Sequence, residues 1–185
     1  MEAASVEAFA ILGNELRAHR APQALQHWSR RAAKEEVVHA QLPAALAKRY
    51  GAKALRAQVD AAPAPRTLEE IALENAVEGC ARETYGALVA RWQAAHAADP
   101  QVRAVMRQVA QDELRHAELG WAIAAWAEPK LSRSARAKVS DAQQQAFAQL
   151  AMSRDVAASE VHFAGLPTRA AASAMALRLS AALDG

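Results

Sequence analysis

The chain has 185 residues, and its 22 basic and 20 acidic side chains give a formal charge of +2. This length suffices for one domain that buries a core of several packed helices. The two signs of charge are interspersed, which argues against a surface for nucleic acid. A single cysteine, Cys80, excludes an intramolecular disulfide framework, and no apolar run approaches the roughly 18–20 residues that span a membrane. We therefore expect a cytoplasmic protein without a membrane partner.

The N-terminal part of the chain predicts two helices. The first is expected over residues 3–17, where apolar side chains recur at helical spacing. Glutamates interrupt its apolar residues, so that we do not expect this segment to be a signal peptide. A turn at 19–22 leads to a second helix over 22–50, which Pro43 is expected to bend or interrupt. Residues 51–66 are the least periodic stretch of the chain.

Strong local signals mark two further helices. The third helix, over 67–96, begins with a capping box between its first residue and Glu70. Asp99 followed by Pro100 is typical of a helix start, and it predicts a fourth helix that Pro129 ends.

Loop lengths predict how these helices are arranged. Short turns join the first helix to the second and the third to the fourth, so that each pair is expected to form an antiparallel hairpin. Residues 51–66 can reach about 50 Å, which exceeds the length of a 25-residue helix at about 1.5 Å per residue. The sequence therefore predicts an all-α fold, with a four-helix bundle over residues 1–128 and a long crossover. Residues 129–185 are expected to add two C-terminal helices, broken near 165–167, whose apolar faces suit a homodimer.

Two copies of a Glu-x-x-His motif are the most informative feature. Glu36 and His39 lie in the second predicted helix, and Glu113 and His116 lie in the fourth. Each copy places a carboxylate and an imidazole one turn apart on a helical face. Because a buried glutamate is rare unless it is paired or bound to metal, a glutamate in an apolar stripe favours a metal ligand. Two copies in corresponding hairpins are a much stronger signal than one.

Two glutamates precede each copy of the motif: Glu2 and Glu7 in one hairpin, and Glu78 and Glu83 in the other. One glutamate from each of two helices, with Glu-x-x-His from two others, is the ligand set of di-iron and di-manganese bundles. Glu2 precedes Glu36 by 34 residues and Glu78 precedes Glu113 by 35, which gives the two hairpins matching spacings. Counted from the turn, Glu83 lies nearly level with Glu113, so that Glu7 and Glu83 are competing candidates.

Four segments resemble the ferritin-like di-iron carboxylate superfamily, and within it a little-characterised bacterial group. They are ASVEAFAILGNELRAHRAPQAL, KEEVVHAQL, EGCARETYGAL and DELRHAELGWAIAAWA. The resemblance covers residues 2–127 and implies a ferritin-like bundle. The metal ligands that it implies are Glu2, Glu36, His39, Glu78, Glu113 and His116. Glu36 and Glu113 are then the bridging ligands, and Glu35 and Asp112 orient histidine ligands through the other ring nitrogen.

The same resemblance implies a function. In this superfamily two ferrous ions reduce oxygen, and the oxidising species attacks a substrate. We therefore expect an O2-dependent oxidase or hydroxylase of a small molecule, with two iron ions or manganese as cofactor and no catalytic residue beyond the metal ligands. The alternatives are a ferroxidase or iron-handling protein, and a metal-binding or degenerate interaction scaffold without redox activity. Tyr85 is expected to hydrogen-bond a ligand, to carry an oxidising equivalent, or to lie in the core with its hydroxyl at an edge.

Overall fold

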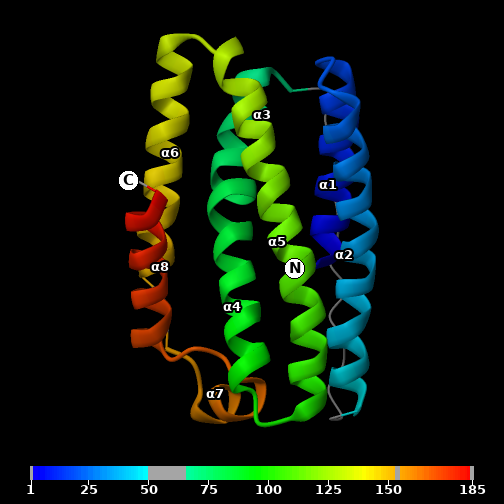
Figure 1. The fold of residues 1–185 in the computed structure, drawn as a ribbon, viewed down its shortest axis with the longest axis vertical. Helices are drawn as coiled ribbons and strands as arrows, with labels where there is room; N and C mark the ends of the chain where they lie inside the picture. The colour runs from blue at the N-terminus through cyan, green and yellow to red at the C-terminus, as the bar shows by residue number, and fades with distance from the viewer. Residues whose placement is uncertain (1, 50–65, 153–154, 184–185) are drawn as a thin grey trace. The chain divides into compact units, whose positions relative to one another are not determined.

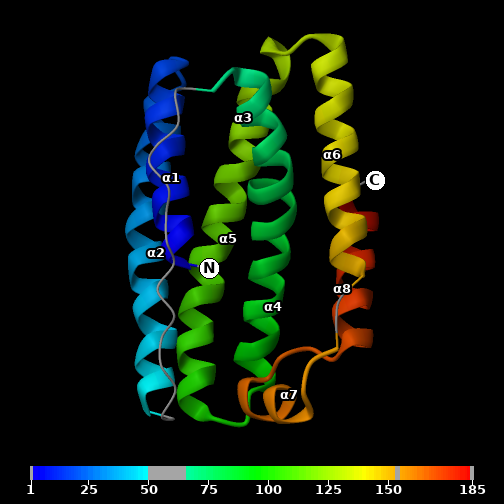
Figure 2. The same cartoon turned by 180° about the vertical axis from the view of Figure 1, so that it is seen from behind.

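The computed structural model describes residues 2–49, 66–152 and 155–183 (Figures 1 and 2). Every regular element within these ranges is a helix, which confirms the all-α prediction. None of the described helices is long and apolar enough to cross a membrane. The predicted crossover falls almost entirely outside the described residues. The chain divides into two compact units, Met1–Ile71 and Ala72–Gly185, and each is described by itself; the predicted division at residue 128 stays a prediction.

The first unit is a helical hairpin. It consists of α1 (Glu2–Ala18) and α2 (Gln23–Arg49), which pack against each other. Arg20 takes a positive φ of 56° in the turn between them. The helix α2 continues through Pro43, so that the predicted interruption is not observed. The flanking alanines and leucines are strong helix formers, and a proline removes only one backbone hydrogen bond.

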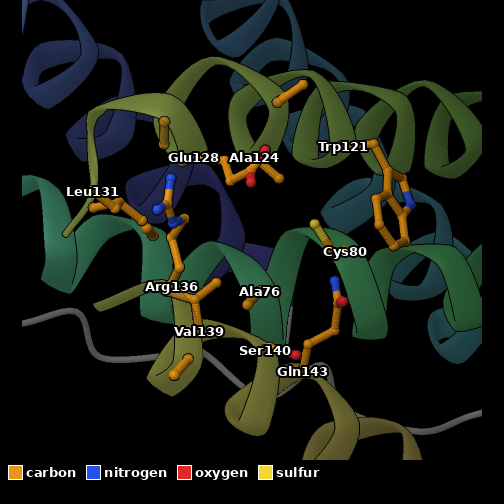
Figure 3. A pocket seen from close by; sticks show the side chains of 14 residues that line it. Ala76, Cys80, Trp121, Ala124, Glu128, Leu131, Arg136, Val139, Ser140 and Gln143 are labelled. Atoms are coloured by element: carbon orange, nitrogen blue, oxygen red, sulfur yellow. The ribbon is translucent and has the colours of Figure 1, made fainter. Parts of the chain in front are cut away.

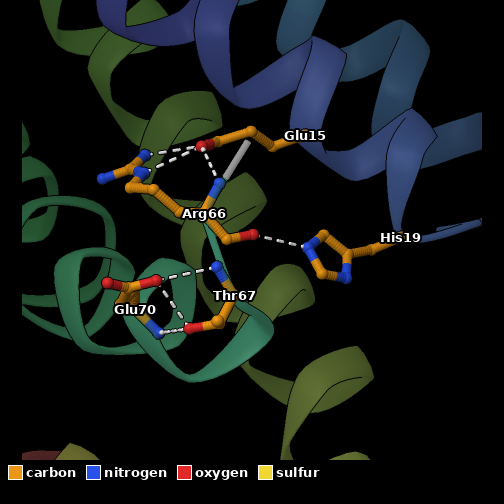
Figure 4. A network of polar contacts seen from close by, with 5 residues as sticks. All are labelled: Glu15, His19, Arg66, Thr67 and Glu70. Atoms are coloured by element: carbon orange, nitrogen blue, oxygen red, sulfur yellow. Dashed lines mark hydrogen bonds and ion pairs between the residues drawn. The ribbon is translucent and has the colours of Figure 1, made fainter. Parts of the chain in front are cut away.

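A partly buried ion pair connects α1 to the chain that enters α3 (Leu68–Asn75) (Figure 4). Arg66 donates from its Nε and Nη2 to the two carboxylate oxygens of Glu15, each at 2.8 Å. His19 donates from Nε2 to the Arg66 carbonyl oxygen at 2.8 Å. Burial alone would raise the pKa of Glu15, but the hydrogen bonds and positive charge of Arg66 outweigh it, so that the pKa is lowered. This network fixes where α3 begins.

The capping box at the start of α3 is confirmed (Figure 4). The Glu70 carboxylate accepts from the Thr67 backbone N–H at 2.8 Å and from its hydroxyl at 2.7 Å. In return, Thr67 Oγ1 accepts from the Glu70 backbone N–H at 3.3 Å. The hydroxyl and the backbone N–H of Thr67 stabilise the charged carboxylate, and they hold the pKa of Glu70 below its ordinary value.

The second unit is built around one long hairpin. After the end of α3 the chain continues as a π-helical segment, η1 (Ala76–Arg82), and then as α4 (Glu83–His96). The returning helix, α5 (Pro100–Ala127), packs along both η1 and α4. Asp99 caps α5 as predicted, since its side chain accepts from the Gln101 backbone N–H at 2.6 Å.

In the described part of the tail, residues 129–152 and 155–183, three α-helices occur instead of the predicted two: α6 (Arg133–Ala151), α7 (Ala158–Ala164) and α8 (Arg169–Leu183). A short 3-10 turn, η2 (Glu128–Lys130), connects α5 to α6. In the second unit, α6 packs against η1 and α8, and α8 also contacts α4 (Figures 1 and 2). The tail therefore covers one side of the long hairpin. The predicted break near 165–167 is confirmed, and Gly165 ends α7 with a left-handed φ of 66°.

The turn between α4 and α5 holds α7 closely. A Cβ on Gly165 would lie 2.3 Å from the backbone nitrogen of Ala97, so that only glycine allows this approach. The Ala98 backbone N–H donates to the His162 carbonyl oxygen at 3.1 Å. Gln93 donates from Nε2 to the Ala164 carbonyl oxygen at 3.0 Å. These backbone-level contacts fix the position of α7 on the hairpin.

Candidate metal centre

In the first unit, α2 carries two of the six predicted ligands, Glu36 and His39. Glu36 is 3% exposed and His39 is 2% exposed. The Nδ1 atom of His39 lies 3.5 Å from Oε1 of Glu36. This exceeds a hydrogen-bond distance, and it is close to the roughly 3.0–3.4 Å that separates adjacent ligand atoms with metal bonds of about 2.1 Å. The neighbouring Glu35 accepts from Arg31 Nε at 2.8 Å.

The second unit brings together three ligand-type side chains from two helices. His116 on α5 is 1% exposed. Its Nδ1 atom lies 3.7 Å from Oε2 of Glu113, one turn earlier on the same helix, and 3.8 Å from Oε2 of Glu83 on α4. Both glutamates are partly buried. The imidazole therefore faces a carboxylate from each of the two helices.

The two upstream glutamates differ in what they face, and the π-helical segment η1 contains one of them, Glu78, and ends directly before the other, Glu83. Its last turn closes with the Glu83 backbone N–H donating to the Glu78 carbonyl oxygen, five residues back. The extra residue in a π turn rotates the following side chains relative to a continuous α-helix. Glu83 faces His116, whereas the Glu78 side chain is 51% exposed and accepts from Arg82 Nη1 at 2.6 Å.

A glycine contact sets the separation of η1 and α5 one turn from this cluster. A Cβ on Gly120 would lie 2.4 Å from the carbonyl carbon of Gly79, which shows how closely the two backbones approach. Asn75 spans the contact and donates from Nδ2 to the Gly120 carbonyl oxygen at 2.9 Å. Neither Asn75 nor Gly120 was among the residues predicted to matter for the site. A glycine inside a helix destabilises it by about 1 kcal/mol relative to alanine. A glycine in a predicted helix is therefore a sequence signal for close packing at that position.

The remaining predicted site residues lie elsewhere or outside the described part. Asp112 is buried and accepts from Arg115, three residues later on α5. The Tyr85 hydroxyl donates to the Ala172 carbonyl oxygen at 3.3 Å, so that it connects α4 to α8. Glu7 is partly buried on α1. Glu2 begins α1, and its side chain is outside the described part of the structure.

The donor set of each unit fits a transition-metal ion. Glutamate oxygens with histidine nitrogens suit iron or manganese, whereas thiolates typify many structural zinc sites. A metal ion would also compensate the buried carboxylates, which are otherwise costly. Comparison of the chain with protein-family models, curated proteins and solved structures finds no match. The chemistry of these side chains is therefore the basis for assigning a function.

Proposed function

We propose that the chain is a di-metal carboxylate protein that uses two iron ions, or manganese, to oxidise a small molecule with O2. The observation that carries this proposal is the recurrence of one arrangement in both units. In each, a glutamate and a buried histidine lie one turn apart, with Nδ1 to carboxylate distances of 3.5 Å and 3.7 Å. The ferritin-like resemblance of the sequence adds the expectation that both pairs serve one metal centre.

The proposed ligands include the glutamate that faces His116. Glu83 precedes Glu113 by 30 residues, and Glu7 precedes Glu36 by 29, so that these two upstream glutamates also occupy equivalent positions in the two hairpins. We therefore take Glu83 and Glu7 as the upstream ligands, with Glu78 and Glu2 as the alternative pair. The complete proposed set is Glu7, Glu36, His39, Glu83, Glu113 and His116.

This set balances the charge of the ions that it would hold. Four carboxylates neutralise two divalent cations, and the two neutral imidazoles add no charge. Glu36 and Glu113 are the proposed bridging ligands. A bound pair of ferrous ions would supply the electrons for the reduction of O2. The buried histidines His39 and His116 would keep bulk water from one side of each ion.

Anaerobic titration of the full chain with ferrous iron, followed by exposure to O2, tests the proposal. We expect about two ions per chain, consumption of O2 and a ferric absorption band. Binding of one zinc ion and no reaction of the iron-loaded protein with O2 would overturn it. Accumulation of ferric mineral far beyond two ions would indicate iron storage. Two bound ions that leave O2 unconsumed would indicate a scaffold.

Paired variants distinguish the two assignments of the upstream ligands. Glu83→Gln should weaken iron binding by about 10-fold or more, because the amide cannot supply a carboxylate charge. Glu78→Gln is the matched control, since Glu78 is 51% exposed and contacts Arg82 on the same segment. The opposite result would move the ligand to Glu78. Glu113→Ala should lower metal content and melting temperature together, and retention of two metals in that variant would exclude Glu113 as a bridge.

A further inference from the structure

The second unit contains a cavity of about 670 Å³ between η1, the end of α5 and α6 (Figure 3). Small-molecule sites typically occupy roughly 300–1,000 Å³, and one water needs only about 10–15 Å³. The floor is deeply buried: Ala76 is 2% exposed, Ala127 is 1% exposed and Cys80 is fully buried. The rim includes the exposed residues Glu128 and Arg136. The cavity is therefore a pocket that opens to the surface on one side.

Small apolar side chains create this space. Six alanines line it: Ala72, Ala76, Ala124, Ala125, Ala127 and Ala137. Trp121, Leu131 and Val139 complete its apolar lining. Protein interiors are normally close-packed, and larger side chains at the alanine positions would fill the volume. The pocket therefore results from small side chains on α3, η1, α5 and α6.

The polar groups of the pocket set the charge of what it can hold. The Gln143 side chain reaches from α6 toward Cys80 (Figure 3). The thiol accepts from Asn75 Nδ2 at 3.6 Å. Burial raises the pKa of Cys80 to about 12, so that the thiol stays neutral at physiological pH. The rim charges of Glu128 and Arg136 are of opposite sign. A charged ligand that entered the pocket would lose hydrating water and would find no buried opposite charge at the floor, so that its binding would be unfavourable.

We propose that this pocket binds a small, uncharged, mainly apolar molecule that makes a hydrogen bond to the side chain of Gln143. No residue that lines the pocket is a proposed metal ligand. Binding here is therefore expected whether or not the metal centre is loaded, which separates this site from the proposed function experimentally.

Titration of the full chain with N-phenylnaphthylamine, an uncharged apolar fluorophore, tests this site. We expect saturable binding of one molecule per chain, unchanged by a metal chelator, and a rise in melting temperature with probe concentration. Ala137→Phe should weaken binding by about 10-fold or more, because the ring occupies the rim. Ala148→Phe is the matched control: both alanines are exposed on α6, and only Ala137 lines the pocket.

Four outcomes would overturn the proposal. These are non-saturable binding, equal weakening by both alanine variants, tighter binding of the anionic anilinonaphthalene sulfonate than of the neutral probe, and the absence of any thermal shift in the unmodified chain. The thermal shift needs no variant, so that the test remains decisive if Ala137→Phe does not fold.

Discussion

Replacing Gly120 by alanine should force α5 away from η1. The added Cβ would lie 2.4 Å from the Gly79 carbonyl carbon and 2.5 Å from its oxygen, whereas ordinary van der Waals contact begins at 3.4 Å. Both atoms belong to the backbone, and neither can rotate out of the way. The helices must separate, and the 2.9 Å hydrogen bond from Asn75 to the Gly120 carbonyl oxygen must lengthen with them.

The expected loss of stability follows from three contributions. Overpacking of this kind costs about 1–3 kcal/mol. Loss of a hydrogen bond costs about 1 kcal/mol, and the better helix propensity of alanine returns about 1 kcal/mol. The last two offset each other, so that the free energy of unfolding falls by about 2 kcal/mol. For a chain of this size the melting temperature should fall by about 4–8 °C.

Thermal unfolding followed by circular dichroism measures this effect, with Gly86→Ala as the control. Gly86 lies on α4, and a Cβ there would meet nothing within 4 Å. The control should therefore gain about 1 kcal/mol and melt about 2–4 °C higher. Equal shifts in the two variants, or a Gly120→Ala protein as stable as the unmodified chain, would refute the close approach of η1 and α5. Iron affinity should fall in Gly120→Ala alone, because only this change separates Glu83 from His116.

Polar contacts in both units give three further expectations. Glu15→Gln should lower the free energy of unfolding at pH 7 by about 2–3 kcal/mol. Since the pKa of Glu15 is lowered in the folded state, its contribution is present above the ordinary value of 4.5 and is lost as the pH falls below it. Urea unfolding of both proteins at pH 7 and near pH 3 checks this, and an undiminished difference in acid would contradict it. Thr67→Ala should cost about 1 kcal/mol in the same assay, with Thr67→Ser retaining most of the cap. The Cys80 thiol should react with a disulfide reagent about 100-fold more slowly in the native than in the urea-unfolded chain, and comparable rates would show that it is accessible.

Helix starts could be predicted from the sequence because their chemistry is local. The box of Thr67 with Glu70 and the cap by Asp99 each involve residues within three positions of one another. The same holds for the break at Gly165, where a left-handed backbone favours glycine. Pro43 shows the limit of such rules, since the surrounding helix formers carry α2 through it.

Spacing left the choice between Glu78 and Glu83 open, because the count from the turn favours Glu83, whereas the matching separations of 34 and 35 residues favour Glu78 with Glu2. Residues 76–82 have the composition of an ordinary α-helix, and only the backbone hydrogen bond from Glu83 to Glu78 reveals the extra residue in the turn. An α-helical count through this segment misplaces every later side chain by about 100°, the angle of one residue at 3.6 per turn. The relative positions of Glu and His in each Glu-x-x-His pair could be predicted, since both residues lie within one regular α-helical turn. The arrangement of the two hairpins as a ferritin-like bundle remains a prediction from loop length and resemblance.

The contact of α7 with the turn between α4 and α5 has a consequence for local unfolding of the second unit. The Ala98 amide is protected by a carbonyl more than 60 positions later in the chain, that of His162. Exposure of this amide therefore requires that α7 and the hairpin tip separate. Hydrogen exchange at this single amide therefore reports whether α7 lies against the turn between α4 and α5. A partner, ligand or cleavage that released α7 would loosen the end of the helices that carry Glu83 and His116 without touching either residue.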